Sequence, residues 1–375
     1  MRPAPATGEM TSLAERKRRA GQRLIVGFGG HSPDLAMRRF IGEARPAGFI
    51  LFGRNIEEPA QVRELNRELH SLLPPALPPL LSVDQEGGRV LRIKATPWPA
   101  MRTLGNMNHL PTTEKVAVAL SEELRAMGFN LDFAPVADVD SNPKNPVIGD
   151  RAFSADPAAA ARQVAAFTRA MQSTGLIATA KHFPGHGDTH TDSHLTLPVV
   201  EKEGPDLERC ELVPFRAAIE AEVGMVMSAH VVFPAWDEEN PATLSRRILH
   251  GILREKLGYS GVICSDDMEM KAVRGRYAVE QQLDLASKAT VDLFIVSQML
   301  TLTPELMVET WETLVRMQEE DKVHETLAEA SNKRLMALRR RFWKNQAPQP
   351  PITVVGSPAN KQLVHYVLAR GGATS

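Results

Sequence analysis

The densest group of chemically active side chains in this sequence lies between Lys181 and His194, a segment that holds four histidines and two aspartates. Pro184, Gly185 and Gly187 oppose a regular helix or strand through its middle, so we expect a polar loop. Histidine titrates close to neutral pH, and loops on a rigid scaffold carry many catalytic groups. The segment therefore indicates a site for catalysis or ligand binding.

The four histidines stand at every fourth position, which on a helix would align them along one face as in a zinc site. They are His182, His186, His190 and His194. Because proline and glycine interrupt the helix, the spacing loses its geometric meaning, and a metal site is not favoured. A surface loop that is rich in histidine without a function is the other alternative. We assign no metal and no cofactor.

Composition describes an ordinary globular protein. The chain has 375 residues, of which 43% are hydrophobic and 24% charged, and a formal net charge of −1. It can bury a large core and shows no electrostatic bias toward nucleic acid or membranes. The two cysteines, Cys210 and Cys264, exclude a disulfide framework and suit a reducing cytoplasm. We expect a cytoplasmic protein, with a monomer as the favoured state.

Two further patterns bear on location. The first 20 residues lack the apolar stretch and cleavage site of a secretory signal. Nowhere do eighteen apolar residues follow one another, so no membrane span is expected.

Short apolar or β-branched runs recur along the chain and predict eight buried strands. They are Leu24–Phe28, Phe49–Phe52, Leu80–Val83, Leu131–Val136, Ile177–Ala180, Met225–Ala229, Val262–Cys264 and Leu293–Val296. Segments of helical composition lie in most of the intervals, at Pro59–Leu73, Thr113–Met127, Pro157–Ser173, Pro205–Ala221, Leu244–Leu257 and Ala278–Ala289. Eight strand–helix units predict an α/β fold, a single (β/α)8 barrel of the TIM type. An open doubly wound sheet is the alternative.

Polar side chains follow these runs at the carboxyl ends of the predicted strands. They are Asp84, Gln85 and Glu86, then Asp138 and Asp140, then Lys181 and His182, then His230, and then Asp266 and Asp267. In a barrel these ends converge on one rim, where active sites of this architecture lie. Distant segments would therefore meet in one pocket.

The ends of the chain differ from its middle. Residues 1–11 are rich in proline, alanine and glycine, and we expect them to be disordered. The barrel is expected over residues 12–345, ending in a charged helix at Glu325–Arg341. Residues 346–375, which begin near a proline-rich stretch, are expected to form a helical or irregular tail.

Five motifs stand in order between residues 83 and 270. They are V-D-Q-E-G-G-R-V at 83–90 with Arg92, D-F-A-P-V-A-D at 132–138, V-I-G-D-R-A-F at 147–153, K-H-F-P-G-H-G-x4-D-S-H at 181–194, and S-D-D-M-E-M at 265–270. Together they resemble glycoside hydrolase family 3, and within it the single-domain bacterial β-N-acetylhexosaminidases of peptidoglycan recycling. The resemblance implies a TIM-type barrel, in agreement with the strand count.

The reaction that the resemblance implies is retaining hydrolysis of a terminal β-linked N-acetylglucosamine through a covalent glycosyl-aspartate intermediate. The motifs map the nucleophile to Asp266 and the general acid/base to His194. Asp192 would orient the ring of His194 and stabilise its cationic form, as a carboxylate does in a catalytic triad. A histidine titrates near neutral pH, so it can donate and accept a proton there. A carboxylic acid in the same role would need a raised pKa.

The resemblance also implies the substrate contacts. The positions that would hold the sugar hydroxyls and the ring that bears the N-acetyl group are Asp84, Arg92, Arg151, Lys181 and His182. A carboxylate accepts hydroxyl protons, while lysine and arginine donate to the remaining sugar oxygens. The expected partner is a small carbohydrate or muropeptide substrate.

Several neighbours of these residues carry weaker expectations. Adjacent strand residues point to opposite faces, so Asp267 is expected to bond the backbone rather than the sugar. Arg89 and Glu86 are a candidate structural pair. His186 is expected to shape its loop, His230 to line the site, and His190 to be solvated.

Other functions remain open at this point. A family 3 β-glycosidase with another substrate or a phosphorylase would use the same fold, since a histidine acid/base would not repel phosphate as a carboxylate would. A metal-dependent hydrolase built on the histidines is an alternative from another class. A non-catalytic sugar-binding protein on the same barrel is a further one, because fold does not determine function.

Overall fold

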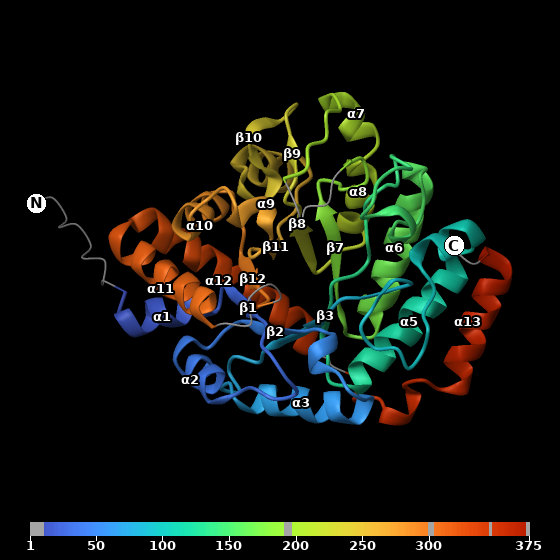
Figure 1. Ribbon diagram of the computed structural model, residues 1–375, viewed down its shortest axis with the longest axis horizontal. Coiled ribbons are helices and arrows are strands. Elements are labelled where there is room, and N and C mark those ends of the chain that lie inside the picture. The colour runs from blue at the N-terminus through green and yellow to red at the C-terminus, as the bar shows by residue number, and fades with distance from the viewer. Residues whose placement is uncertain (1–10, 191–196, 299–303, 345–346, 373–375) are drawn as a thin grey trace, which may run out of the picture.

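The computed structural model describes residues 11–190, 197–298, 304–344 and 347–372, and a closed barrel of eight parallel strands forms its centre (Figure 1). In order around the barrel, the strands are β1 (Leu24–Val26), β2 (Gly48–Leu51), β3 (Leu80–Val83), β6 (Leu131–Asp132), β7 (Ile177–Phe183), β8 (Met225–Ser228), β11 (Val262–Asp267) and β12 (Leu293–Val296). β12 pairs with β1 and closes the sheet. The predicted barrel is confirmed, and an open sheet is excluded.

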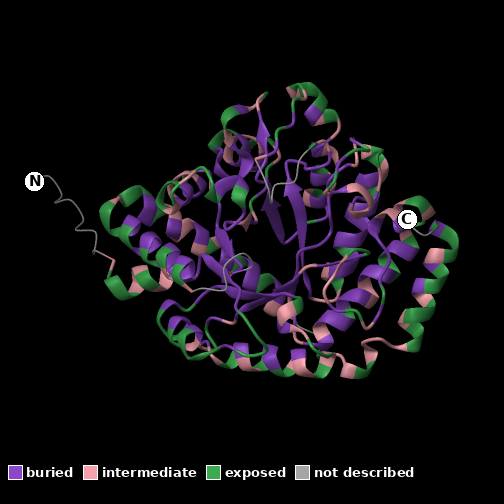
Figure 2. Ribbon diagram, in the orientation of Figure 1, coloured by how far each residue is buried: buried purple, intermediate pink, exposed green. Residues whose placement is uncertain are grey.

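The strands are buried on both faces, which is why they read as continuous apolar runs (Figure 2). In β1, Ile25 belongs to the apolar cluster inside the barrel, whereas Leu24 and Val26 pack in the larger cluster between strands and helices. Burying one such side chain contributes about 1.5–3 kcal/mol. Two apolar layers therefore stabilise the wall on which the strand ends are carried.

Helices cover the outside of the barrel and follow the strands along the chain (Figure 1). They are α1 (Leu13–Gly21), α2 (Leu35–Ala44), α3 (Pro59–Ser71), α4 (Met101–Met107), α5 (Leu110–Ala126), α6 (Pro157–Ser173), α7 (Gly204–Arg209), α8 (Leu212–Glu220), η4 (Arg247–Lys256), α9 (Lys271–Arg274), α10 (Val279–Lys288), α11 (Glu305–Glu320), α12 (Lys322–Trp343) and α13 (Pro358–Gly371). α6 has the predicted bounds; it begins at an Asp156 cap, whose side chain accepts from the Ala159 amide. No helix of the described residues is long and apolar enough to cross a lipid bilayer.

Short antiparallel strand pairs and helical turns lie at the carboxyl ends of the barrel strands. Two antiparallel pairs are β4 (Gln85–Gly87) with β5 (Val90–Leu91), and β9 (Val232–Phe233) with β10 (Asp237–Pro241). The turn η5 (Ile352–Val354) lies apart, in the C-terminal segment against α5. The short helical turns at the strand ends are η1 (Gly53–Asn55), η2 (Gly149–Arg151) and η3 (Ala242–Leu244). These insertions surround the rim on which the predicted site residues lie.

Several predicted bounds differ from the structure; for example, β6 ends at Asp132 rather than Val136, and β1 at Val26 rather than Phe28. The segment from Lys181 was expected to be a loop throughout, but β7 continues to Phe183, because the Ala229 amide donates to the Phe183 carbonyl at 2.8 Å. The helix expected over 205–221 is divided into α7 and α8. Pro214 has no amide hydrogen, and the division places it in the first turn of α8, where proline is tolerated.

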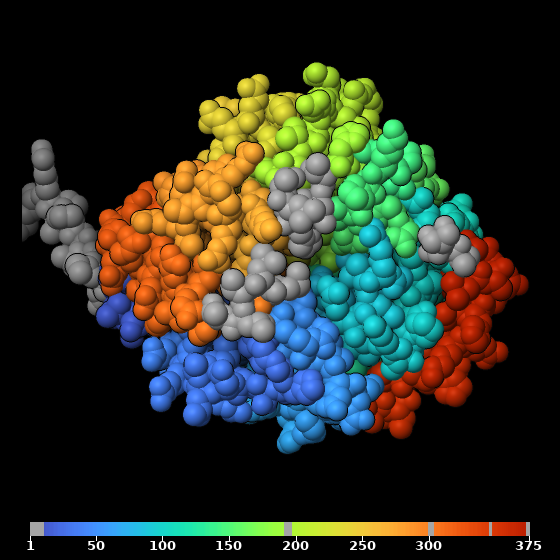
Figure 3. All heavy atoms as spheres, in the orientation of Figure 1, coloured from blue at the N-terminus to red at the C-terminus, as the bar shows by residue number. Residues whose placement is uncertain are grey.

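The C-terminal segment packs against the barrel helices beside α4 and α5, as the red and cyan regions of Figure 3 show. Glu123 of α5 is buried and accepts hydrogen bonds from the Gly356 amide at 3.0 Å and the Asn360 side chain at 2.7 Å. Val364 and Val367 of α13 are buried as well. Polar and apolar contacts thus join this segment to the barrel.

Candidate active site

A cavity of about 170 Å³ opens at the carboxyl ends of the barrel strands. Six of the predicted site residues line it: Asp84, Arg92, Arg151, Lys181, His182 and Asp266. They come from segments far apart in the sequence, and the closed barrel brings them together. Apolar side chains, among them Phe52 and Met227, complete the lining.

A network of four charges forms one wall of the cavity. The Lys181 ammonium lies 2.8 Å from an Asp84 oxygen and 2.6 Å from a Glu86 oxygen. Arg151 donates to both oxygens of Glu86. Burial alone would raise the pKa of Glu86, but Arg151 and Lys181 outweigh burial and hold it well below its usual range. The carboxylates in turn keep the pKa of Lys181 above its ordinary value, so the network stays ionised.

Glu86 was missed as a site residue, and its expected partner was wrong. It pairs with Arg151, whereas Arg89 donates to Asp150 at 2.9 Å near the surface. Proximity in the sequence favoured Arg89, but η2 places Arg151 over the strand end that carries Glu86. The position of Glu86 at a strand end was the one available signal.

Arg92 lies at the edge of the same network. Its guanidinium is 3.6 Å from Asp84 and stands over the ring of Phe52, with 5.7 Å between guanidinium carbon and ring centroid. The Gln85 side chain accepts from the Arg92 and Ile93 amides at 2.9 and 3.0 Å. These bonds hold the β5 end that presents Arg92 to the cavity.

Asp138 organises the histidines at the start of the loop. One of its oxygens lies 2.7 Å from His182 Nδ1, and the other accepts from the His186 amide at 2.7 Å. Arg151 approaches His182 Nε2 at 3.4 Å as a donor, so Nε2 is the acceptor and Nδ1 carries the hydrogen that Asp138 receives. Asp138 was noticed in the sequence only as a strand-end residue, and its partner is set by β6 and β7 lying side by side.

The residues that lead into the loop are closely held. The Asn145 amide group donates to the carbonyls of His186 and Gly187 at 2.8 and 3.0 Å, and His186 Nδ1 lies 2.9 Å from Thr189 Oγ1. His186 thus shapes the loop, as expected. His190 is exposed, as expected, with its ring 3.2 Å from Asn142. Asp192 and His194 lie outside the described residues.

Asp266 and Asp267 both line the cavity, contrary to the expectation that adjacent strand residues diverge. The reason is a register shift in β11. Cys264 pairs with Leu293 but Asp267 pairs with Ile295, so one extra residue stands between the two pairings. Such a shift re-aims side chains at a strand end.

The two aspartates differ in their surroundings. An Asp266 oxygen accepts from the Asp267 amide at 2.8 Å. Asp267 accepts from the Glu269 and Ser297 amides at 3.1 and 3.4 Å and from the Ser297 hydroxyl, the backbone-bonding role expected for it. Burial raises the pKa of Asp267 to about 7, with Glu269 contributing, while the Ser297 hydroxyl opposes the shift. Asp267 is thus held by two backbone amides and a hydroxyl, and both carboxyl groups lie at the cavity.

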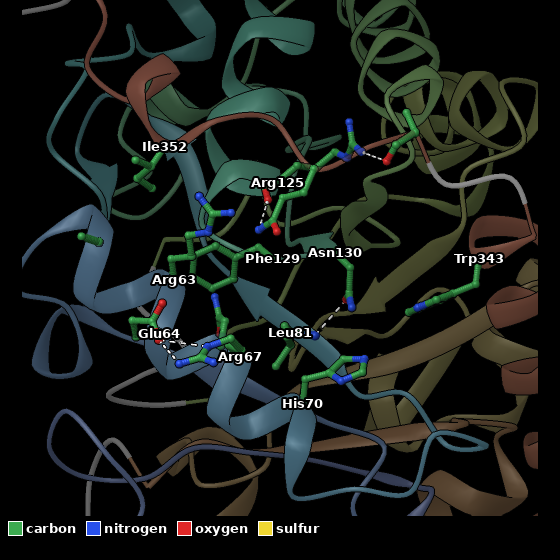
Figure 4. A pocket seen from close by; sticks show the side chains of 15 residues that line it. Arg63, Glu64, Arg67, His70, Leu81, Arg125, Phe129, Asn130, Trp343 and Ile352 are labelled. Carbon is green, nitrogen blue, oxygen red and sulfur yellow. Dashed lines mark hydrogen bonds and ion pairs between the residues drawn. The ribbon is translucent and has the colours of Figure 1, made fainter.

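A roomier groove of about 740 Å³ lies at the opposite end of the barrel, beside α3, α5 and the chain after α12 (Figure 4). Its basic lining residues, Arg63, Arg67, His70 and Arg125, outnumber its one acidic residue, Glu64. Active sites of this architecture lie at the carboxyl ends of the strands, and the predicted site residues of the described chain are found there. The smaller cavity is therefore the candidate active site.

Among the residues that the structure describes, no three His, Cys, Asp or Glu side chains are grouped so that they could hold a metal ion. Four charged groups of the cavity are paired with one another: Glu86 with Arg151 and Lys181, and Lys181 also with Asp84.

Comparison with known proteins identifies the family of the barrel. Residues 19–338 match the family described as glycosyl hydrolase family 3 N terminal domain. A protein named Beta-hexosaminidase from Pseudomonas aeruginosa is 39% identical over 276 residues, which cover 73% of this chain and 81% of that protein. A Beta-hexosaminidase from Nitrosomonas eutropha is 39% identical over 257 residues, or 66% of this chain and 73% of that protein.

Solved structures are similar over most of the barrel. A family 3 β-N-acetylglucosaminidase from Paenibacillus superposes with a TM-score of 0.87 at 36% identity, covering 95% of this chain and 68% of that one. NagZ from Neisseria gonorrhoeae, solved in complex with N-trifluoroacetyl-D-glucosamine, gives 0.75 at 28% identity, with 93% and 98% covered. Since the family match takes in every strand of the barrel, the chain belongs to glycoside hydrolase family 3 and is a glycoside hydrolase.

Proposed function

We propose that the protein is a retaining exo-β-N-acetylglucosaminidase that removes terminal β-linked N-acetylglucosamine through a covalent intermediate on Asp266. The observation that carries the proposal is that Asp266 lines the same small cavity as Asp84, Arg92 and Lys181. A nucleophilic carboxylate must lie beside the groups that hold the sugar ring, because its attack on the anomeric carbon requires close positioning. The similarity to proteins named Beta-hexosaminidase supports the identity of the sugar.

The charged wall suits the recognition of sugar hydroxyls. Asp84 accepts from Lys181 through one oxygen and lies 3.6 Å from Arg92 through the other, so adjacent hydroxyls could each find a charged partner. Hydrogen bonds to charged groups contribute about 1.5–3 kcal/mol each. Arg151 and His182 extend this surface, and we assign all five residues to substrate binding.

We assign the proton transfers to His194. In the first step its imidazolium would donate a proton to the leaving oxygen while Asp266 bonds to the anomeric carbon. In the second step neutral His194 would take a proton from the water that displaces Asp266. Asp192 would orient the ring and stabilise its cation. The closely held loop base at Asn145 and His186, beside the cavity, supports this assignment.

We further propose that the natural substrates are peptidoglycan-derived muropeptides and that the enzyme acts in the cytoplasm. The resemblance in the motifs supports the assignment of muropeptides as substrates. The two cysteines, both without a disulfide, fit a reducing compartment. A terminal sugar entering a cavity of about 170 Å³ is consistent with exo-cleavage, since the cavity has no room for a long chain.

The test is trapping with a 5-fluoro N-acetylglucosaminyl fluoride, followed by peptide mapping. Labelling of Asp266 is expected in the native enzyme and not in Asp266→Asn. Turnover without any labelled peptide would indicate that the substrate's own acetamido group is the nucleophile and would refute the intermediate. Repeating turnover of p-nitrophenyl N-acetylglucosaminide with and without phosphate, and identifying the sugar product, distinguishes hydrolysis from phosphorolysis.

A further inference from the structure

The residue that follows Asp266 is held from two sides by different means. Pairing of β11 with β8 runs from Val262 opposite Met225 to Ser265 opposite Ser228 and ends there, one residue before Asp266. On the other side, the Met268 amide donates to the Ile295 carbonyl of β12 at 2.9 Å. β8 ends at Ser228, so the end of β11 has no further pairing with that strand, and another group holds it on that side.

His230 occupies that place. It stands two positions beyond the end of β8, is fully buried, and its Nε2 lies 3.0 Å from the Asp267 carbonyl oxygen. A carbonyl only accepts, so Nε2 carries the hydrogen and donates it. In a regular sheet, the next backbone amide of β8 would donate to this carbonyl. Here the His230 imidazole donates to it instead. His230 is absent from the lining of the cavity, so the expectation that it faces the site was wrong.

Thr243 fixes the orientation of this ring. Its Oγ1 lies 2.9 Å from His230 Nδ1, and its backbone amide donates to the Ala229 carbonyl at 3.1 Å. The same hydroxyl is within 3.0 Å of the Ala229 carbonyl and 2.9 Å of Ser228 Oγ. The hydroxyl hydrogen of Thr243 goes to the Ala229 carbonyl, and the contact of its oxygen with Nδ1 holds the imidazole ring in place.

The chain of bonds ends on the reacting carboxylate. The residue whose carbonyl His230 holds is the one whose amide donates to Asp266 at 2.8 Å. We propose that His230, oriented by Thr243, is a positioning residue that fixes the Asp267 backbone and through it the direction of the Asp266 carboxylate. The inference rests on the proposed role of Asp266 as nucleophile. His230 itself transfers no proton to or from the substrate.

The experiment compares His230→Leu, which keeps bulk but loses the donor, with His230→Gln, which keeps an N–H donor. Thr243→Val and Thr243→Ser form a second pair that removes or keeps the hydroxyl. We expect His230→Leu to slow labelling of Asp266 by the 5-fluoro reagent about 10- to 100-fold, the range in which small displacements of reacting groups fall. Thr243→Val should show a smaller loss, and His230→Gln and Thr243→Ser should recover most of the rate.

Binding and pH provide the readouts that a general loss of structure would not reproduce. The dissociation constant of N-acetylglucosamine should change less than about threefold, because the sugar-binding wall is untouched. The pKa values of the rate profile should stay unchanged. His250→Leu, a half-buried histidine on η4 away from the cavity, is the matched control and should label at the native rate.

Each outcome decides one question. If folded His230→Leu and Thr243→Val, judged by their melting temperatures, label Asp266 at the native rate, the positioning role is refuted while the proposed function stands. If His230→Leu removes one limb of the pH profile, His230 is a proton-transfer group and the proposal is overturned. If the native enzyme is not labelled at Asp266, the proposed function itself fails.

Discussion

Arg151 donates two hydrogen bonds of 2.8 Å, from Nε and Nη2, to the two carboxylate oxygens of Glu86, and the pair is almost excluded from solvent. Such a planar, two-point pair combines geometric specificity with strength. Lys181 contacts the same carboxylate at 2.6 Å. One buried anion therefore holds two cations at the wall of the cavity.

The first prediction concerns Glu86→Gln. Removing the charge leaves Arg151 and Lys181 without a shared counter-ion in a buried place, and breaking such a pair costs about 3–5 kcal/mol. We expect a loss of that order in the free energy of unfolding, measured by urea denaturation. KM should rise as well, since both cations lose their fixed positions.

Arg89→Gln is the matched control, because the Arg89–Asp150 pair is much more exposed than Glu86–Arg151. Its loss should cost less than about 1 kcal/mol. Equal losses in the two variants would contradict the view that burial makes the Glu86 network decisive.

The second prediction concerns Gly187→Ala. A Cβ at this position would stand 1.5 Å from the Val139 carbonyl oxygen, a backbone atom that cannot turn aside. The loop base must then move away from the cavity, and kcat should fall about tenfold or more. Steady-state kinetics on a p-nitrophenyl substrate would measure this.

Gly42→Ala separates this clash from a general effect of replacing glycine. Gly42 is exposed on α2, and an added Cβ meets nothing within 4 Å. We expect unchanged kinetics and a gain of about 0.5–1 kcal/mol in stability, since alanine favours the helix. A Gly187→Ala enzyme with native kcat would show that the loop base can shift without consequence.

The third prediction is a pH dependence of stability. Burial, together with the nearby His182, lowers the pKa of His186 to about 4. In the unfolded chain a histidine titrates near 6.5, so between about pH 6.5 and 4 the unfolded state binds the extra proton. Stability therefore falls as pH drops through this window, by at most about 3 kcal/mol from this residue.

His186→Asn should remove that part of the slope. The free energy of unfolding, measured by urea titration between pH 4 and 7.5, should decrease less steeply with falling pH in the variant than in the native protein. Parallel curves for the two proteins would mean that His186 is not held in its neutral form.

The fourth prediction tests the proposed acid/base. His194→Ala should lose about 10²- to 10⁴-fold in rate on glycosides with poor leaving groups, which need a proton, and much less on a dinitrophenyl glycoside. His190→Ala, an exposed histidine of the same segment, is the control and should behave as the native enzyme. An equal loss on both substrates would assign His194 a structural role instead.

Continuous apolar runs in the sequence predict all eight strands of the barrel. Runs such as Leu24–Val26 and Leu293–Val296 are continuously hydrophobic because barrel strands are buried on both faces. Their ends were less certain. β7 continues to Phe183, since β8 supplies hydrogen bonds that a single sequence does not display.

The strand ends predict that Asp84 and Asp266 meet at one rim of the barrel, and the resemblance to family 3 adds Arg92; all three line the cavity. The hydrogen-bond and ion-pair partners of these side chains could not be predicted in the same way. Glu86 binds Arg151 rather than Arg89, Asp138 binds His182, and His230 supports Asp267 from behind.

These pairings depend on the register between neighbouring strands and on where inserted turns such as η2 fall over the rim. A shift of one residue in β11 turned Asp266 and Asp267 to the same cavity, which alternation along a strand does not allow. The sequence gives the side chains that are present, and its apolar runs predict which segments are buried. Contacts between residues that are distant along the chain arise only when the barrel closes, since closure sets the distances between them.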